Sequence, residues 1–339
     1  MTIQEAIERF YAHKDLSHGE MSEVMHDIMS GDVSPLLMGG FLVGIQVKGP
    51  TVEELSAAAA IMRGFSTKVI VDEPDRLIDT CGTGGDGTKT FNISTASAFV
   101  VAAAGGRVAK HGGRSVSSSS GSADVLEALG VRLDLSPEAV SKCIETVGIG
   151  FMFAPGHHSA MKHAGPVRRE LAVKTLFNVL GPLTNPAGAK RQVMGVFDRS
   201  LLVQQARVLQ QLGSTRAMVV HGEDGLDEIS PSGTTHVAEL RDHEVLEYHV
   251  TLNELGVQPI DLDDIRVEGL QDAVSMFRDV INGHHQPGKT AVVLNAGASL
   301  YVLEVVKNLA DGVSLATEMI DTGRASRKLA EFIALTQAD

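Results

Sequence analysis

Two glycine-rich stretches of the sequence contain residue types that bind phosphate groups. The first, residues 77–95, is predicted to form a short apolar strand, a loop with four glycines between Gly82 and Gly87, and a helix that begins near Asn92. Glycines allow backbone N–H groups to approach a bulky anion, and a helix start offers free donors at the positive end of its dipole. The stretch indicates a phosphate or pyrophosphate site. The alternative is a flexible turn capped by Ser and Thr, since glycine loops also occur without a ligand.

The second stretch, residues 110–124, follows a predicted strand at 107–110. It contains Lys110, Arg114, two adjacent glycines and a run of serines, and it also precedes a predicted helix. Cations, hydroxyl groups and glycine backbone in this arrangement again suit an anion. Because open α/β sheets bind ligands at the carboxyl ends of their strands, both loops are expected to line one cleft. For this stretch alone, a solvated serine-rich loop is the alternative.

An acidic pair, Asp227 and Glu228, follows another predicted strand at 217–221. Carboxylates suit Mg²⁺ that bridges to substrate phosphates, and the two glycine loops provide a place for those phosphates. A solvated acidic turn is the alternative. Asp86, inside the first loop, is unexpected for a plain anion site because a carboxylate repels phosphate. It is expected to accept a hydrogen bond from a sugar hydroxyl, to hold a metal-bound water or to fix the loop backbone.

A basic and histidine-rich segment follows at residues 157–170. Its three histidines could hold zinc, but no cysteine and no H-E-x-x-H spacing supports that site, and hydrogen-bonded structural histidines are favoured. Arg168 and Arg169 are predicted to open a helix, where positive charge opposes the dipole. That local cost indicates that one arginine faces a partner such as a bound carboxylate. A surface salt bridge is the alternative.

Several common catalytic motifs are missing from the sequence. Neither glycine loop ends in Gly-Lys-Ser/Thr, and there is no G-x-S-x-G elbow and no protein-kinase signature set. The spacing after Gly82 and Gly84 also lacks the third glycine of the dinucleotide-binding fingerprint. These patterns exclude a P-loop NTPase and argue against a kinase, an α/β-hydrolase and a dinucleotide-binding enzyme.

The composition limits the partners and the compartment. The 339 residues are 43% hydrophobic and 21% charged, with a formal net charge of −13, which argues against a nucleic-acid or membrane surface. The two cysteines form no disulfide framework, no basic and apolar leader opens the chain, and no apolar run approaches the length of a membrane span. We expect a cytoplasmic protein.

The elements that must position these groups fall into two kinds. Helices are predicted at 3–13, 18–30, 35–48 and 52–66, because three Ser/Thr-x-x-Glu capping boxes and one Ser-Pro start precede apolar residues at helical spacing. From about Val69 short β-branched runs alternate with helices. Strands are expected at 107–110, 149–154, 193–197, 217–221 and 290–295, with an antiparallel pair at 235–240 and 245–250. Helices are expected at 122–129, 137–147, 170–180, 201–212, 272–281, 299–308, 314–322 and 326–335.

This alternation indicates an α/β protein with a mostly parallel central sheet covered on both faces, preceded by a small all-helical domain. We place the helical domain at residues 1–68 and the α/β domain at 69–339.

The chain resembles the anthranilate phosphoribosyltransferases, which belong to the nucleoside phosphorylase-like phosphoribosyltransferases. Order and spacing match over essentially the whole chain. The motifs that carry the resemblance are residues 82–86, 92–95, 110–112, Arg168, residues 181–186 and the Asp227-Glu228 pair. The resemblance implies a small helical domain joined by a middle segment near 168–190, a larger α/β domain and a homodimer formed through the helical part.

The resemblance also implies an activity: transfer of the phosphoribosyl group from 5-phosphoribosyl 1-pyrophosphate to anthranilate in tryptophan biosynthesis. Mg²⁺, as two ions, would be held by Ser94, Asp227 and Glu228. Anthranilate would contact Gly82, Gly113 and Arg168. The expected donor-binding residues are Gly82, Gly85, Asp86, Thr90, Asn92, Ile93, Ser94, Thr95, Lys110, His111, Gly112, Arg114, Ser118 and Ser122.

Five positions depart from the family pattern. Gly113 stands where the family has Asn, Ser119 where it has Lys, Ser159 where it has Pro, Ala172 where it has Gly, and Lys174 where it has Arg. Because the family's Asn contacts the acceptor, Gly113 leaves open a different aromatic amine. The sequence also leaves open a pyrimidine nucleoside phosphorylase-like enzyme, which would lack the acidic pair, and a nucleic-acid-binding relative, which the charge disfavours.

Overall fold

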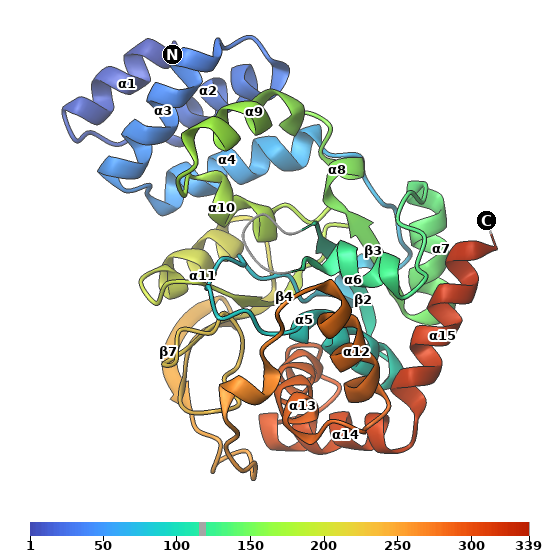
Figure 1. Ribbon diagram of the computed structural model, residues 1–339. Helices are drawn as coiled ribbons and strands as arrows, with labels where there is room; N and C mark the ends of the chain where they lie inside the picture. The colour runs from blue at the N-terminus through green and yellow to red at the C-terminus, as the bar shows by residue number, and fades with distance from the viewer. Residues whose placement is uncertain (115–119, 339) are drawn as a thin grey trace.

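The computed structural model describes residues 1–114 and 120–338. It has a helical part, at the top of Figure 1, and a larger α/β part below it. The first four helices are α1 (Ile3–Tyr11), α2 (His18–Ser30), α3 (Pro35–Lys48) and α4 (Val52–Phe65). The prediction of four N-terminal helices is therefore confirmed, with ends that differ by at most two residues from those expected.

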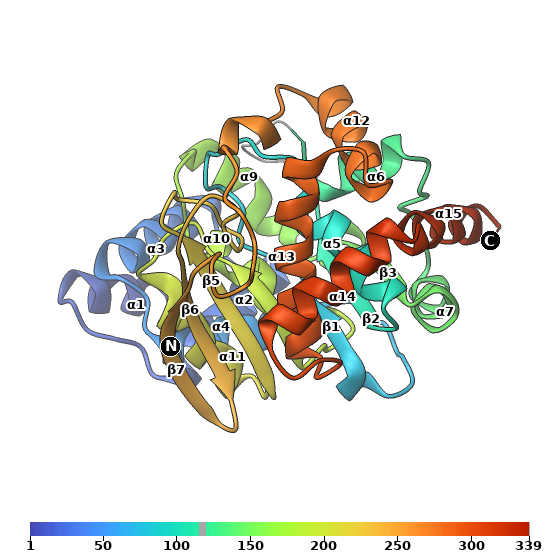
Figure 2. The same cartoon turned by 90° about the horizontal axis from the view of Figure 1, so that it is seen from below.

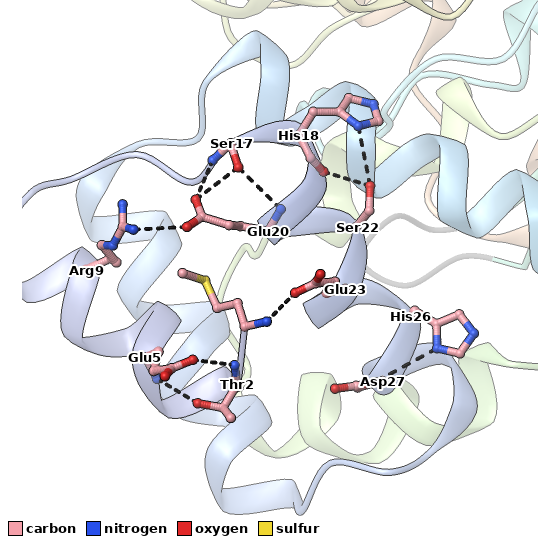
Figure 3. Close-up of polar contacts among 11 residues, drawn as sticks. Thr2, Glu5, Arg9, Ser17, His18, Glu20, Ser22, Glu23, His26 and Asp27 are labelled. Atoms are coloured by element: carbon pink, nitrogen blue, oxygen red, sulfur yellow. Dashed lines mark hydrogen bonds and ion pairs between the residues drawn. The ribbon is translucent and has the colours of Figure 1, made fainter.

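The predicted capping boxes explain where three of these helices begin. Thr2 and Glu5, Ser17 and Glu20, and Thr51 and Glu54 each exchange both hydrogen bonds of a capping box. Figure 3 shows the first two boxes side by side, with Arg9 donating to Glu20 at 2.9 Å between them. The N-terminal amine of Met1 also contacts Glu23, so the chain start is tied to α2.

A segment from the middle of the chain joins the helical part. Helix α9 (Met161–Leu171) packs against α2 and α3, and the short α10 (Phe177–Leu180) packs against α4. Ala164, Val167 and Phe177 belong to the same apolar cluster as the side chains of the first four helices. The segment expected to join the helical domain thus lies on it, whereas the boundary at residue 68 stays a prediction.

The helix predicted at 170–180 is wrong as a single element. Helix α9 ends at Leu171, and Ala172 has φ +51° and ψ +28°, in the left-handed region, which stops the helix before α10 begins. Arg168 and Arg169 therefore lie in the last turn of α9 and do not open a helix. There, positive charge interacts favourably with the dipole, so the expected electrostatic cost does not exist.

A seven-stranded sheet forms the centre of the α/β part, with strand order β3-β2-β1-β4-β5-β6-β7. The first five in this order pair in parallel, and β5, β6 and β7 pair antiparallel. The strands are β1 (Leu77–Asp79), β2 (Arg107–Gly112), β3 (Ile149–Phe153), β4 (Arg191–Gly195), β5 (Arg216–Gly222), β6 (Thr235–Arg241) and β7 (Glu244–Val250). The predicted mostly parallel sheet is confirmed.

Alternating side chains bury both faces of this sheet. Met218 and Val220 of β5 belong to the core shared with α5, α13, α14 and α15, whereas Ala217 and Val219 belong to the core shared with the helical part. In Figure 2 the sheet lies between these two groups of helices. The remaining helices are α5 (Ile93–Ala103), α6 (Ser122–Ala128), α7 (Pro137–Val147), α8 (Ala154–His157), α11 (Leu201–Gln211), α12 (Leu270–Ile281), α13 (Gln286–Val302), α14 (Leu309–Asp321) and α15 (Arg324–Gln337), with short 3-10 turns at Pro74–Arg76, Gly181–Leu183 and Leu262–Ile265.

The strand predicted at 290–295 is wrong. These residues lie inside α13, which packs on α5 and α14 and has a continuous buried run from Ala291 to Val302. A short apolar run buried on all sides has no periodicity that distinguishes a strand from a helix. The helix expected at 299–308 is only the end of α13. In the described part of the chain, no helix is long and apolar enough to cross a membrane.

Candidate active site

One large cleft, of about 1120 Å³, opens at the carboxyl ends of β1, β2, β4 and β5. The glycine loop after β1, the loop after β2, the residues around α9 and α10, and the acidic pair after β5 all line it. Every residue expected to bind the donor, anthranilate or Mg²⁺ lines this cleft except Ser118, which lies outside the described residues, whereas the three histidines of residues 157–170 do not line it. The prediction that both loops face one cleft is confirmed, while the ligand that each residue binds stays a prediction.

The acidic pair lies directly against the glycine loop. The Gly84 N–H donates to Oδ2 of Asp227 at 2.8 Å, and the Ser94 N–H donates to Oε1 of Glu228 at 3.1 Å. A Cβ on Gly195, at the end of β4, would lie 1.4 Å from the Asp227 carbonyl oxygen, so only glycine allows the two backbones to approach this closely. The pair is therefore part of the site, and the solvated acidic turn is ruled out.

Both carboxyl groups of the acidic pair bind a proton more tightly than an ordinary carboxyl group does. Burial raises the pKa of Asp227 well above its ordinary value, and the nearby charges of Asp86 and Glu228 raise it further. The pKa of Glu228 rises to about 7, again chiefly through burial, and the charge of Lys110 opposes the rise. Two buried carboxylates beside a third are costly in the ionised form unless a cation neutralises them.

The donor set fits a magnesium ion in part. Asp227, Glu228 and the Ser94 hydroxyl offer hard oxygen ligands, and a cation beside the pair would offset the repulsion between the neighbouring carboxylates. Among the described residues, no three His, Cys, Asp or Glu side chains are arranged to hold a metal ion. The remaining ligands of Mg²⁺ would therefore be water and substrate oxygens, which is the usual arrangement for this ion.

Lys110 is buried beneath the glycine loop. Its Nζ donates to the Thr80 carbonyl at 2.9 Å and lies 3.3 Å from both the Thr80 and Ser94 hydroxyl oxygens. These contacts match the three donors of an ammonium group. Lys110 therefore fixes the start of α5 and supplies a positive charge next to Glu228.

Asp86 holds the glycine loop in shape. Its carboxylate accepts from the Thr88 N–H at 3.1 Å and from the Thr88 hydroxyl at 2.7 Å, and also from the Asp227 N–H at 3.3 Å. Of the three roles considered from the sequence, these contacts are those of a group that fixes the loop backbone. Thr95, in the first turn of α5, lines the cleft, and its buried hydroxyl has no hydrogen-bond partner within the described part of the chain.

The loop after β2 is packed tightly where it turns into α6. A Cβ on Gly112 would lie 2.3 Å from the Ser122 hydroxyl, which itself donates to the Gly113 carbonyl at 3.3 Å. Arg114 forms ion pairs with Asp124 and Glu127, both at 2.8 Å. The Arg114 guanidinium is therefore engaged with α6, and it contacts a donor phosphate only if these pairs are exchanged.

Arg168 is the basic group on the opposite side of the cleft. Its guanidinium is half-buried, lies 5.4 Å from the centre of the Phe177 ring and pairs with no carboxylate among the described residues. Burial lowers the pKa of Arg168. An arginine without an acidic partner at a cleft can bind a carboxylate in bidentate fashion, so the surface salt bridge is ruled out. Nearby, a Cβ on Gly113 would meet, among the residues that the structure describes, only the Ala154 Cβ at 3.9 Å.

The histidines do not form a zinc site. His111 and His158 lie with ring centres 5.0 Å apart, His157 faces the Thr67 carbonyl at 2.9 Å, and His163 packs against Gly31 in the helical part. Among the described residues, no hydrogen bond of good geometry reaches the buried ring nitrogens of His111 and His158, although backbone groups of Gly181 and Thr184 raise their pKa values slightly. Burial lowers the pKa of His111 to about 3 and that of His158 to about 4, with the neighbouring histidines adding to the effect.

Two residues that sequence reasoning missed support the whole site. Asp79, the last residue of β1, is fully buried and accepts from the His111 N–H at 3.2 Å and from Asn185 Nδ2 at 2.7 Å. Asn185 also donates to the Ala109 carbonyl at 2.8 Å. Burial raises the pKa of Asp79 to about 6, and Asn185 opposes the rise. A polar residue inside an apolar strand was the one available signal for Asp79.

The fold and the site together define a two-part transferase. The chain matches two family descriptions: "Glycosyl transferase family, helical bundle domain" over residues 4–66 and "Glycosyl transferase family, a/b domain" over residues 74–326. The curated anthranilate phosphoribosyltransferase of Thioalkalivibrio sulfidiphilus is 56% identical over 336 residues, 99% of each chain. That of Methylobacillus flagellatus is 53% identical over 338 residues, 100% of this chain and 99% of its own. The chain belongs to the anthranilate phosphoribosyltransferase family.

Solved structures agree with this assignment. The anthranilate phosphoribosyltransferase from Thermus thermophilus has a TM-score of 0.93 at 41% identity and covers 98% of this chain and 99% of its own. The enzyme from Saccharomyces cerevisiae in complex with PRPP and Mg has a TM-score of 0.90 at 26% identity, covering 99% and 98%.

Proposed function

We propose that this chain transfers the phosphoribosyl group of 5-phosphoribosyl 1-pyrophosphate to anthranilate, giving N-(5-phosphoribosyl)anthranilate and pyrophosphate in tryptophan biosynthesis. One observation carries the proposal: a glycine loop hydrogen-bonded to a half-buried acidic pair shares a single cleft with an arginine that has no acidic partner among the described residues. Full-length identity to curated members of the family supports it.

The proposed chemistry needs positioning and charge stabilisation rather than a strong base. The bond between ribose C1 and the pyrophosphate oxygen breaks with its electron pair going to the leaving group, while the amine nitrogen of the acceptor bonds to C1 and its proton passes to solvent. Backbone N–H groups of the glycine loop and of the start of α5 stabilise the leaving group where its charge develops. Mg²⁺, held by Asp227, Glu228 and Ser94, supplies the matching positive charge when bound.

Each side of the cleft takes one substrate in this proposal. Arg168 holds the anthranilate carboxylate, with Gly82 and Gly113 beside the ring. Lys110 fixes Ser94 and neutralises Glu228. The donor lies against Gly82, Gly85, Asp86, Thr90, Asn92, Ile93, Ser94, Thr95, Lys110, His111, Gly112, Arg114, Ser118 and Ser122. Two magnesium ions, as the family resemblance implies, remain part of the proposal.

A related acceptor is the second candidate, and one observation favours it. Among the described residues, a Cβ on Gly113 would meet a single atom, at 3.9 Å, so these residues leave room there for a ring substituent or a larger aromatic amine. A nucleoside phosphorylase is disfavoured, since it does not need the buried acidic pair.

The test is turnover with Mg²⁺, phosphoribosyl pyrophosphate and anthranilate, followed by the loss of anthranilate fluorescence. Asp227→Asn with Glu228→Gln should lower kcat/KM by roughly 10²-fold or more, because the leaving-group charge is left without its cation. Asp242→Asn, in the exposed β6–β7 turn, serves as the matched control. If pyrophosphate is released with another aromatic amine but not with anthranilate, anthranilate is not the acceptor and the other amine takes its place in the proposal. Unchanged kinetics in the double variant would remove the metal assignment.

We also propose a homodimer formed through the helical part, located in the cytoplasm. Leu36, Val43 and Val47 are 85%, 43% and 74% exposed, and their spacing places them on one face of α3. Burial of this apolar face against a second copy would remove it from water. Light scattering of the wild type and of Leu36→Glu with Val47→Glu tests the contact, and a wild-type monomer would contradict it.

A further inference from the structure

Lys174 bridges the two sides of the cleft. It lies in the short connection between α9 and α10, and its Nζ donates to the Gly85 carbonyl at 3.2 Å. The same nitrogen lies 3.3 Å from the centre of the Phe197 ring, just beyond the end of β4. A Cβ on Gly85 would meet the Lys174 Cε at 3.9 Å, so the lysine stem also packs against the loop. One side chain therefore contacts the glycine loop and the β4 edge from the acceptor side.

The backbone on both sides of Lys174 is fixed. The Ala172 N–H donates to the Arg168 carbonyl at 3.1 Å, which ties the turn to the last turn of α9. The Thr175 N–H donates to Asn178 Oδ1 at 2.9 Å, which ties it to α10. Lys174 and Arg168 are therefore linked through a short hydrogen-bonded connection, through which we expect a movement of α9 to reach the Lys174 ammonium.

These contacts are too weak and too exposed to hold the fold together. Lys174 is exposed, and its two partners are a carbonyl oxygen and a ring face at the mouth of the cleft. An exposed cation–ring contact contributes little to global stability. It can nevertheless link the glycine loop to the connection that carries Lys174, because both of its contacts reach across to the donor side of the cleft.

We propose that Lys174 is a positioning residue that couples the acceptor-side helix α9 to the donor-side glycine loop, so that a ligand on one side favours binding on the other. The inference rests on the proposed function, because it takes the glycine loop as the pyrophosphate site and Arg168 as the carboxylate site. Coupling of this kind is reciprocal between the two ligands.

The experiment measures the dissociation constant of anthranilate by its fluorescence, with and without Mg²⁺-pyrophosphate. No ribose is present, so no reaction occurs and the binding is at equilibrium. In the wild type, pyrophosphate should tighten anthranilate binding by roughly five-fold or more. Lys174→Met keeps the length of the stem and should reduce this factor to about one, since its thioether cannot donate to the Gly85 carbonyl.

Three further variants make the result specific. Lys174→Arg retains a donor and a cation over the ring and should restore the coupling factor. Phe197→Leu should lower the factor, and combining it with Lys174→Met should add little. The matched control is Lys190→Met. Lys190 lies away from the cleft, where its Nζ pairs with Asp75 Oδ1 at a distance of 2.7 Å, so this variant should behave as the wild type.

The outcomes separate this inference from the proposed function. If the wild type neither binds nor converts anthranilate, the proposed function fails. If the wild type converts anthranilate but pyrophosphate leaves anthranilate binding unchanged, the coupling inference is overturned. It is also overturned if Lys174→Met retains the wild-type factor, or if Lys174→Arg loses it while its melting temperature is unchanged.

Discussion

Asp227 and Glu228 occupy their positions because glycines beside them allow the backbones to approach. The backbone of Asp227 lies against Gly195, and the Asp227 carboxylate accepts from the Gly84 N–H. The position of the acidic pair thus depends on Gly84, which follows β1, and on Gly195, which ends the neighbouring strand β4, and not only on the loop that contains the pair. Its charge is balanced by Lys110 on one side and, in the proposed reaction, by Mg²⁺ on the other.

Gly195→Ala tests this placement at the scale of a single methyl group. The new Cβ would lie 1.4 Å from the Asp227 carbonyl oxygen, so the acidic pair must shift. A shift of about 1 Å at the reacting groups costs roughly 10²-fold in kcat/KM. The measurement is steady-state kinetics over a range of Mg²⁺ concentrations, with circular dichroism to verify the fold.

Gly233→Ala is the matched control, because a Cβ there meets nothing within 4 Å and its backbone is not in the left-handed region. It should leave kcat/KM within about two-fold of the wild type, as surface substitutions usually have little effect. Wild-type kinetics for Gly195→Ala would show that the pair does not depend on this close approach.

At the scale of elements, the break between α9 and α10 determines the acceptor side. Ala172 stops α9 in a left-handed conformation that glycine adopts more readily, and the chain then turns so that Lys174 reaches the glycine loop. A straight helix over 170–180 would not produce this turn. The strain at one alanine is therefore part of how the cleft is built.

Ala172→Gly should stabilise the protein. Removing the Cβ relieves the left-handed strain, and the greater freedom of glycine in the unfolded chain cancels part of the gain, leaving roughly 0.5–1 kcal/mol. Chemical denaturation measures the change. Ala60→Gly, at an exposed position inside α4, is the control and should destabilise by about 1 kcal/mol. Equal losses in both variants would contradict the assigned strain.

Sequence reasoning succeeded where local chemistry determines the element. Capping boxes specified where α1, α2 and α4 begin, and two glycine loops after strands indicated one cleft. It failed where tertiary burial decides. The apolar run at 291–294 becomes a helix because α5 and α14 cover it, and Ala172 gives no local signal for a helix stop. Asp79 and Asn185 lie 106 positions apart, so no local pattern could have paired them.

At the scale of the whole molecule, the cleft is a meeting of two cores. The core of the α/β part includes side chains of α5, while the core that includes the helical part contains Ala164 and Val167 of α9. Two buried histidines lie close together beside the cleft: His111 near the end of β2 and His158 after α8, with ring centres 5.0 Å apart. Both rings are buried, and burial opposes their protonation.

This arrangement predicts acid sensitivity with a definite sign. The folded-state pKa values of His111 and His158, about 3 and about 4, lie below the ordinary value of 6.5. Below pH 6.5 these two rings therefore bind protons in the unfolded chain but remain neutral in the folded one. The free energy of unfolding consequently falls as the pH falls towards 4. Asp79 acts in the opposite sense. Its pKa of about 6 lies above the ordinary 3.8, so its contribution is present at low pH and is lost as pH rises through 6.

Replacing both histidines isolates their contribution from that of every carboxylate. The double variant His111→Gln with His158→Gln should lose less stability in acid than the wild type does. The difference between the two proteins, the variant's free energy of unfolding minus that of the wild type, should therefore be higher at pH 5 than at pH 8 by roughly 2–4 kcal/mol. Urea unfolding at several pH values gives this difference, and the value at pH 8, where histidines are neutral, serves as the internal control. A difference that stays constant with pH would mean that these rings are protonated as easily in the folded protein as in the unfolded chain. Water would then reach both rings in the folded protein.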